Sequence, residues 1–508
     1  MLRARVSRTV VGAALALPVP VVAGDRPDPS LIRDGDGYTA VTTSGGWSPG
    51  FRILRSGDLR DWRIVGSAFR RPPRWARTRL WAPELTRLAA RYAIFYSALP
   101  RRKRSWYCLG VATARAAGGP YRDRGRPLRC GRHGSIDPFP VRDEGGRLYL
   151  LWKEDGNEFG RPTPILAQRL SEDGMRLRGR PRELIRNTDP WEGRVVEAPS
   201  VIRRDGYFYL FYSANLCCSP SCAYAVGVAR STTLLGPWEK FSGNPILRDG
   251  NGWRCPGHPS IVPDAGGGLR TLFHAYRSGT GVLAGRQLLA DEVSFGPDGW
   301  PRIGTGIPAP PLPGAQSTGF SDTFPGPWLA FEWEWPTERP PRVRVRAGLR
   351  LAAGARAGRR VDAAVISRRV GSDRYVATAV VSRDALRGRA LAGLAAYGGG
   401  FEAIGAAVGR RRLLVWERRD GRYQRLAETA PPGSEFAHLR LTSRGRRVLF
   451  EFSGDGHTWQ PLGEEWITPV EESARIALTA GVRRRAVSRF AGASLSEQPA
   501  PVEPSRRR

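Results

Sequence analysis

The chain has 508 residues, more than one ordinary hydrophobic core holds, so at least two domains are expected. Its content of 41% apolar and 25% charged residues is typical of a globular protein. The formal net charge is +33, but the arginines are spread over every segment and only three of the 80 basic residues are lysines. A concentrated basic stripe would indicate a nucleic-acid partner, and this even spread argues against one.

The first residues carry three arginines and then an apolar run from Val10 to Ala23 that is too short to span a bilayer and contains two prolines. This pattern predicts a signal peptide over residues 1–17 and a secreted, extracellular protein without a membrane anchor, with a short anchor as the alternative. Cleavage near Ala16 is preferred to cleavage near Ala23, because the later site would leave Asp28 almost at the new terminus.

From residue 18 to residue 302 one pattern occurs five times: a proline, a short apolar run, a turn and an aromatic-rich strand. In the fullest copy, 195–214, Glu197 stands near the proline and Asp205-Gly206 forms the turn expected of a hairpin. The anchors are Pro29, Pro83, Pro138, Pro199 and Pro259, separated by 54, 55, 61 and 60 residues. Five strand-rich units of this size predict a five-bladed β-propeller. Because proline restricts its predecessor, we expect extended backbone just before each one.

The remainder of the chain also indicates β-structure. Residues 303–319 are rich in proline and glycine and predict a linker. Short runs of alternating polarity over 320–495 predict an antiparallel β-sandwich, and the Pro/Arg-rich end, 496–508, predicts a disordered tail. The predicted fold class is therefore all-β, a five-bladed β-propeller followed by an antiparallel β-sandwich.

All six cysteines lie within the predicted propeller. In an exported protein they are expected to form structural disulfides, with 15 pairings open and Cys108 with Cys130 as the first expectation. A metal site at Cys217-Cys218-x3-Cys222 is the alternative, but no second pair at zinc-ligand spacing supports it.

The innermost strand of each blade starts near the axis of a propeller, so residues beside the five prolines should converge. This chain places there Asp28, Trp81, Asp137, Glu197 and His258. Converging carboxylates raise one another's pKa, and cleavage of a glycosidic bond needs one carboxyl group as acid and another as base. Trp81 offers a face for stacking on a sugar.

Each of these residues also has a structural interpretation. The three carboxylates could cap turns, Trp81 could pack between blades, and His258 could be a hydrogen-bonded core histidine. His133 and His274 are interpreted as structural. The polar residues near the blade openings are interpreted as surface or subsite residues: Glu84, Asp155, Glu158 and Arg286.

In combination these motifs resemble glycoside hydrolase family 43 over residues 18–302. The motifs are Arg26-Pro27-Asp28-Pro29-Ser30, Trp81-Ala82-Pro83-Glu84, Ser135-Ile136-Asp137-Pro138, Val196-Glu197-Ala198-Pro199 and Gly257-His258-Pro259-Ser260. The resemblance implies an inverting hydrolase acting on arabinose- and xylose-containing plant polysaccharides. By that likeness Asp28 is the general base, Glu197 the general acid, and Asp137 the residue that orients Glu197 and raises its pKa. Ala198 stands where many members have glycine, and one additional methyl group is compatible with the role of Glu197.

Trp81, His258 and Arg286 are predicted to bind the substrate. No cofactor is required, although His258 matches a histidine that in some members contributes to a central metal or water site, which allows Ca²⁺. Residues 320–494 are similar to the concanavalin-like sandwich of many members, in some of which a sandwich loop closes one side of the pocket. Segments 152–157 and 211–215 favour an arabinofuranosidase, with a β-xylosidase close behind.

Three other interpretations compete with this one. A fructan- or sucrose-cleaving propeller hydrolase would carry Arg-Asp-Pro and Glu-Cys motifs, whereas this chain has Ile136 before Asp137 and Ala198 after Glu197. A non-catalytic, secreted carbohydrate-binding propeller would keep Trp81 but would not need converging carboxylates. A scaffold for protein partners would need neither.

Overall fold

The computed structural model describes residues 20–89, 91–101, 106–280, 282–311, 317–354, 360–482 and 487–498, so the predicted signal peptide lies outside the described residues. Strands dominate these ranges, with two single turns of 3-10 helix, η1 (Asn157–Phe159) and η2 (Pro190–Glu192). Over the same ranges no helix has the length and apolar character needed to cross a bilayer. The all-β prediction is confirmed.

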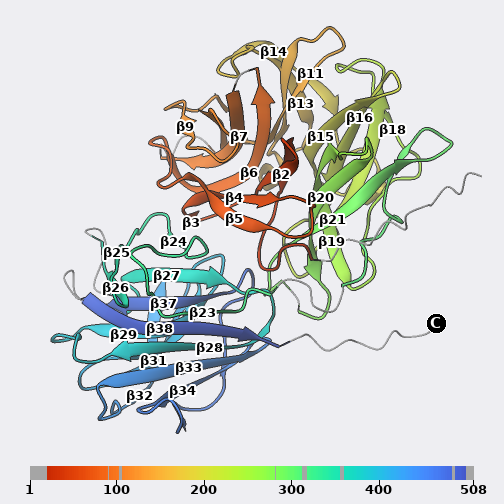
Figure 1. The fold of residues 1–508 in the computed structure, drawn as a ribbon. Helices are drawn as coiled ribbons and strands as arrows, with labels where there is room; N and C mark the ends of the chain where they lie inside the picture. Colours follow the sequence, from red (N-terminus) through yellow and green to blue (C-terminus); the bar gives the residue numbers. More distant parts are fainter. Residues whose placement is uncertain are drawn as a thin grey trace, which may run out of the picture.

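Within the described residues, the first two thirds of the chain forms five antiparallel sheets in chain order (Figure 1). The first sheet contains β1 (Ser30–Asp34), β2 (Gly37–Val41), β4 (Gly50–Ser56) and β5 (Arg63–Phe69). The second contains β6 (Ala76–Leu88), β7 (Arg91–Pro100), β8 (Cys108–Ala114) and β10 (Arg129–Cys130), with β9 (Arg122–Asp123) beside β8. The third contains β11 (Ser135–Arg142), β12 (Leu148–Glu154), β13 (Ile165–Leu170) and β14 (Leu177–Ile185).

The last two sheets have the same layout. The fourth contains β15 (Val196–Arg204), β16 (Tyr207–Ala214), β17 (Ala225–Ser231) and β18 (Glu239–Lys240), and the fifth contains β19 (Trp253–Pro263), β20 (Leu269–Arg277), β21 (Gln287–Phe295) and β22 (Pro301–Ile303). The first strands of neighbouring sheets contact one another, and β19 contacts β1, so the five sheets close into a ring. The ring is the predicted propeller, with its five first strands around the axis.

The segment before β1 also belongs to the propeller. Val21 donates a backbone hydrogen bond of 2.9 Å to Leu288 on β21, and the side chains of Val21 and Val22 are buried among residues of the first and fifth sheets. Loss of these residues would expose part of that core.

A second unit of two packed sheets follows (cyan and blue in Figure 1). One sheet contains β25 (Arg342–Val345), β26 (Leu349–Ala352), β38 (Val487–Glu497), β28 (Arg374–Ser382), β33 (Phe436–Arg444), β34 (Arg447–Ser453) and β35 (Gln460–Pro461), with β23 (Phe320–Asp322) and β36 (Trp466–Ile467) at its sides. The other contains β27 (Ala364–Arg369), β37 (Arg475–Gly481), β29 (Leu391–Tyr397), β30 (Ala403–Val408), β31 (Leu413–Arg419) and β32 (Arg422–Thr429). Strands such as β28 and β33 alternate buried and half-buried residues, as in a β-sandwich. β38 continues to Glu497, past the expected end of the sandwich at 495.

The propeller and the sandwich are joined by paired backbone and by aromatic contacts. β3 (Trp47–Ser48) of the propeller pairs with β24 (Trp335–Pro336), and the Trp47 ring lies 5.2 Å from that of Phe401 on the sandwich. Near them, the buried carboxylate of Glu334 meets several arginines from both units. Such contacts fix the position of the sandwich beside the first blade.

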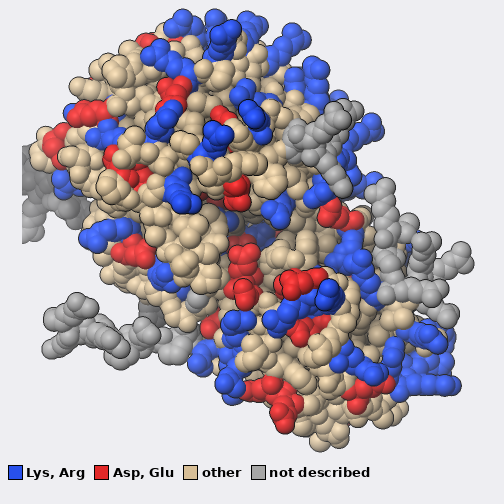
Figure 2. Space-filling model, turned by 180° about the vertical axis from the view of Figure 1, so that it is seen from behind, with Lys and Arg blue, Asp and Glu red and all other residues tan. Residues whose placement is uncertain are grey.

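The six cysteines form three disulfides. Cys108 pairs with Cys130, as predicted, and joins strands β8 and β10. The other two bonds are Cys222–Cys255, between the fourth and fifth sheets, and Cys217–Cys218, between neighbouring residues. All cysteines are therefore engaged in disulfides, in agreement with the structural interpretation. On the face shown in Figure 2, basic side chains are scattered among acidic ones and form no single stripe.

Candidate active site

The residue before each anchor proline does not have the extended conformation expected from the sequence. Its φ is 53° at Asp28, 43° at Ala82, 55° at Asp137, 55° at Ala198 and 56° at His258, all in the left-handed region. The prediction was wrong because the first strands bulge here: the pairing register shifts at this point in sheets two to five. A bulge redirects side chains, and strained backbone of this kind is concentrated at functional sites.

These five residues occupy equivalent positions in the five blades. This corrects the set expected from the sequence, which had Trp81 and Glu197 in place of Ala82 and Ala198. Trp81 and Glu197 stand one position earlier, two residues before their prolines. The backbone N–H of every bulge residue donates to a side chain from the preceding blade. The pairs are Asp28 to His274, Ala82 to Thr43, Asp137 to Ser97, Ala198 to Asp137 and His258 to Ser213, at 2.7–3.1 Å. The strained turns are thereby held in place around the axis.

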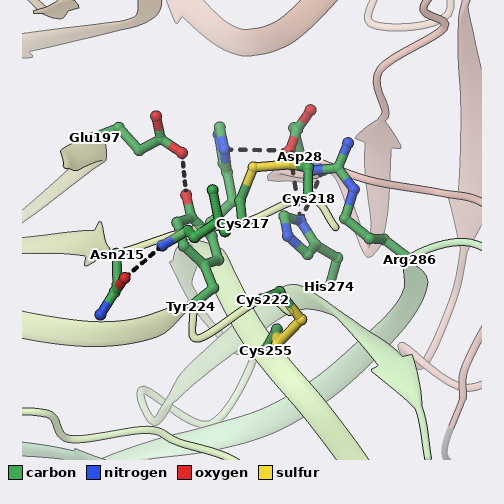
Figure 3. The surroundings of a disulfide bond; sticks show 12 residues. Asp28, Glu197, Asn215, Cys217, Cys218, Cys222, Tyr224, Cys255, His274 and Arg286 are labelled. Carbon is green, nitrogen blue, oxygen red and sulfur yellow. Dashed lines mark hydrogen bonds and ion pairs between the residues drawn. A yellow bond between two sulfur atoms is a disulfide. The ribbon is translucent and has the colours of Figure 1, made fainter. Parts of the chain in front are cut away.

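Asp28 lies in a cationic environment (Figure 3). Arg286 donates from Nη1 to Oδ1 at 2.9 Å, the Thr43 hydroxyl donates to Oδ2 at 2.7 Å, and His258 Nδ1 lies 3.5 Å from Oδ1. Burial alone would raise the pKa of this carboxyl, but Arg286, followed by His258 and His274, lowers it below its usual range. Asp28 is therefore ionised at neutral pH.

Glu197 begins the fourth blade and is held at both oxygens. Lys153 donates from Nζ to Oε2 at 2.7 Å, and the hydroxyl of Tyr224 donates to Oε1 at 2.8 Å. Lys153 also pairs with Asp155 at 3.0 Å. Burial alone would lower the pKa of Lys153, but Glu197 and Asp155 raise it above its ordinary value, so the lysine remains charged. These bonds fix the orientation of the Glu197 carboxyl group.

Asp137 is the third carboxyl group of the cluster. Its Oδ2 accepts a hydrogen bond of 3.0 Å from the N–H of Ala198, the residue after Glu197. Burial, then the charge of Glu197, raise the pKa of Asp137 well above its usual range, against the opposing effect of Lys153. The buried pair of Asp137 and Glu197 therefore retains a proton at a pH where an isolated carboxyl would have lost it.

Two histidines line the other side of Asp28. His274, interpreted as structural from the sequence, accepts the Asp28 N–H at Nδ1 and stacks on Tyr224 with an interplanar angle of 4°. Burial, followed by the Arg286 charge, lowers the pKa of His274 well below its usual range, so the ring is neutral, as an accepting Nδ1 requires. The Nδ1 atom of His258 lies 3.5 Å from Oδ1 of Asp28.

A central calcium ion has little support from these side chains. Ca²⁺ takes six to eight oxygen ligands. Across the described ranges, no three His, Cys, Asp or Glu side chains are grouped as a metal site would require. His258, the candidate ligand, is a nitrogen donor next to the Asp28–Arg286 ion pair. The donor set therefore does not fit the ion.

Trp81 and Arg286 lie at different parts of the site. Trp81 is half-buried and stacks on Tyr107, with ring centroids 4.3 Å apart, so one of its two faces is already covered. Arg286 is bound to Asp28. Beside it, Ser473 and Ala474 of the sandwich donate backbone hydrogen bonds to Val282 and Leu283. A sandwich loop therefore contacts the propeller next to the site.

Sequence reasoning missed Lys153, Tyr224, His274 and Thr43. Lys153 could have been found from the repeat. In sheets two to five, the residue two positions before the anchor proline pairs with one residue of the second strand. That residue is Ser97 on β7, Ser213 on β16 and His274 on β20, and on β12 it is Lys153. In a chain with three lysines, one lysine at a repeat position occupied elsewhere by serine or histidine indicates a specific use for an ammonium group.

Two family models match the chain, one described as Glycosyl hydrolases family 43, over residues 17–301, and one as Beta xylosidase C-terminal Concanavalin A-like domain, over residues 321–493. The chain belongs to glycosyl hydrolase family 43. The family predicted from the five motifs is thus confirmed, together with the sandwich domain appended to it.

Relatives with assigned activities extend over both domains. The chain is 26% identical to a xylan 1,3-β-xylosidase from a Vibrio species, over 87% of this chain and 90% of that protein. It is 26% identical to xylosidase/arabinosidase 43B from Humicola insolens, over 87% and 88%. The fold is shared with the family 43 protein BlXynB from Bacillus licheniformis, at 21% identity and a TM-score of 0.79, over 95% of this chain and 100% of that one. The protein is accordingly an enzyme that hydrolyses O-glycosyl bonds, and the non-catalytic alternatives fall away.

Proposed function

We propose that this enzyme removes terminal arabinofuranose or xylose from plant cell-wall polysaccharides or their oligosaccharides, with inversion at the anomeric carbon. The observation that supports this most is the contrast between two parts of one carboxyl cluster. Asp28 is held ionised by Arg286, while the Asp137–Glu197 pair retains a proton. Carboxyl groups with pKa values driven apart are the usual basis for separate base and acid roles.

In the proposed mechanism Asp28 is the general base. Its carboxylate removes a proton from a water molecule as the oxygen of that water attacks the anomeric carbon. Arg286, His258 and Thr43 hold Asp28 in one orientation. An inverting enzyme needs the two carboxyl groups about 6.5–9.5 Å apart to accommodate this water.

Glu197 is the general acid of the proposal. It donates the proton of the Asp137–Glu197 pair to the glycosidic oxygen as the bond to the anomeric carbon breaks. Asp137 acts through its charge and its hydrogen bond to Ala198, which fixes the backbone beside Glu197, and is a positioning residue. Trp81, His258 and Arg286 are proposed to contact the sugar. The sandwich loop that contacts Val282 and Leu283, close to Arg286 in the sequence, supports action at chain ends.

Two sugars fit this proposal, and each has support. The segments 152–157 and 211–215 favour an arabinofuranoside. Two relatives that span both domains are named a xylan 1,3-β-xylosidase and a xylosidase/arabinosidase, which favours a β-xyloside. We expect hydrolysis of 4-nitrophenyl α-L-arabinofuranoside, 4-nitrophenyl β-D-xyloside or both, measured side by side with purified enzyme. Proton NMR of the first product should show the inverted anomer, and no release from either glycoside would contradict the proposal.

The pH profile of kcat/KM should show the raised pKa of the carboxyl pair. Because Asp28 is ionised even in acid, the loss of activity at high pH should report deprotonation of the Asp137–Glu197 pair, well above the usual carboxyl pKa of about 4. In Asp137→Asn the carboxyl group whose pKa is raised is gone, so the alkaline limb should move toward acid. An unmoved limb would contradict the role of Asp137.

Secretion is part of the same proposal. Disulfides persist in oxidising compartments, and the described residues contain three. One relative, 25% identical over 54% of this chain, is named an extracellular endo-α-(1→5)-L-arabinanase of Bacillus subtilis. A polymeric plant substrate also requires an enzyme outside the cell.

A further inference from the structure

The disulfide between Cys217 and Cys218 joins neighbouring residues. A disulfide stabilises a fold mainly by closing a loop in the unfolded chain, and the effect grows with the number of residues enclosed. Cys108–Cys130 and Cys222–Cys255 span sequence separations of 22 and 33, whereas Cys217–Cys218 spans one. Loop closure therefore gives this bond almost no stabilising role, and its purpose must be local.

Its surroundings are those of the carboxyl cluster. Cys217 packs against the buried group of Cys222, Tyr224, Cys255, Tyr276 and Val282. Tyr224 of this group donates its hydroxyl to Glu197 and stacks on His274, which accepts the backbone N–H of Asp28. Figure 3 draws the disulfide in the same region as Glu197, Asp28 and Tyr224. Cys217 is half-buried and Cys218 exposed, so the bond is not sealed in the core.

The loop that carries the bond is fixed at both ends. At its start, the Asn215 N–H donates to the carbonyl oxygens of Glu192 and Val195. The Ala223 N–H donates to the Leu216 carbonyl at 2.9 Å, which closes the loop on itself, and Cys222–Cys255 ties its end to β19. A contact surface held in this way loses little conformational freedom when a ligand binds.

We propose that the Cys217–Cys218 disulfide is part of the sugar-binding wall of the active site, in contact with the C–H face of the pentose between Asp28 and Glu197. This inference rests on the proposed function. Sugar pockets combine a few polar groups with apolar surface, and sulfur is polarisable and weakly hydrated. The polar groups here are the carboxylates with Arg286 and Lys153, and the disulfide supplies apolar surface on the blade that also carries Glu197. Trp81, on the second blade, supplies another such surface.

The test is the double variant Cys217→Ala/Cys218→Ala, which leaves no free thiol. With the glycoside that the wild type hydrolyses, KM should rise about tenfold, the effect of losing one apolar pocket contact. The pH profile and the unfolding temperature should stay at wild-type values, because no titrating group and no enclosed loop is lost. The matched control is Cys108→Ala/Cys130→Ala, which should leave KM unchanged and lower the unfolding temperature.

An unchanged KM in an active Cys217→Ala/Cys218→Ala variant would overturn the inference and leave the proposed function intact. A fall in unfolding temperature as large as that of the Cys108→Ala/Cys130→Ala control would also overturn it, because the bond would then be structural. A wild type that neither hydrolyses the two glycosides nor binds arabinose or xylose in calorimetry would overturn the proposed function and this inference with it.

Discussion

Replacing Glu197 with glutamine is expected to abolish hydrolysis of natural oligosaccharides, with kcat at least about a thousandfold lower. General acid catalysis contributes roughly 10²–10⁴-fold. The amide retains the size of the side chain and one of the two oxygens that accept from Lys153 and Tyr224, but its NH2 group cannot accept the other hydrogen bond and it has no acidic proton to donate. Initial rates of pentose release from an arabino- or xylo-oligosaccharide measure the effect, with Glu172→Gln, an exposed glutamate paired with Arg142, as the matched control.

The leaving group distinguishes an acid from a base. A 4-nitrophenolate departs without protonation, so Glu197→Gln should lose much less activity on the aryl glycoside than on the oligosaccharide. Asp28→Asn should lose activity equally on both substrates, because the attacking water needs its base in either case. Equal losses for Glu197→Gln on the two substrates would mean that Glu197 is not the general acid. A larger loss for Asp28→Asn on the oligosaccharide would mean that the two roles are exchanged.

The parts of this structure that could be predicted from the sequence are those marked by local chemistry. The five prolines stand within or just before the inner strands, so their spacing revealed the blades, and Asp28, Asp137 and Glu197 were found because they lie close to those prolines. Lys153 and His274 come from second strands and Tyr224 from the segment before β17. Their contacts depend on how neighbouring blades face one another, which no local pattern records.

The backbone conformation at the prolines shows a different limit. Proline disfavours helical backbone in the residue before it, so extended backbone was expected at that residue. The side-chain acceptor offered by the preceding blade to each bulge N–H makes the left-handed turn stable, and that acceptor lies 39 to 246 residues away in the sequence. A similar limit applies to the cysteines: 15 pairings were open, and the Cys217–Cys218 bond became visible only in three dimensions.

Replacing Glu334 with glutamine is expected to destabilise the enzyme by about 3–5 kcal/mol, the usual cost of removing one partner from a buried ion pair. Glu334 accepts from Arg475 at 2.5 Å and from Arg369 at 3.2 Å, both on the sandwich, and from Arg52 of the propeller at 3.4 Å. All four side chains are buried. Burial alone would raise the pKa of Glu334, but Arg369, Arg475 and Arg52 lower it well below its usual range. The glutamine would leave these arginines buried without a counter-charge.

Urea unfolding followed by tryptophan fluorescence would measure the loss, with Glu338→Gln as the matched control. Glu338 pairs with Arg77 of the propeller at 3.3 Å, but both side chains are largely exposed, and such pairs contribute about 0–1 kcal/mol. The lowered pKa of Glu334 also predicts the direction in which stability changes with pH. Its stabilisation should be complete above the unfolded-state pKa of about 4 and decline as the pH falls further, and Glu334→Gln should lack this acid-dependent part. If Glu334→Gln unfolds at the same urea concentration as Glu338→Gln, the buried arginines do not depend on this carboxylate for their stability.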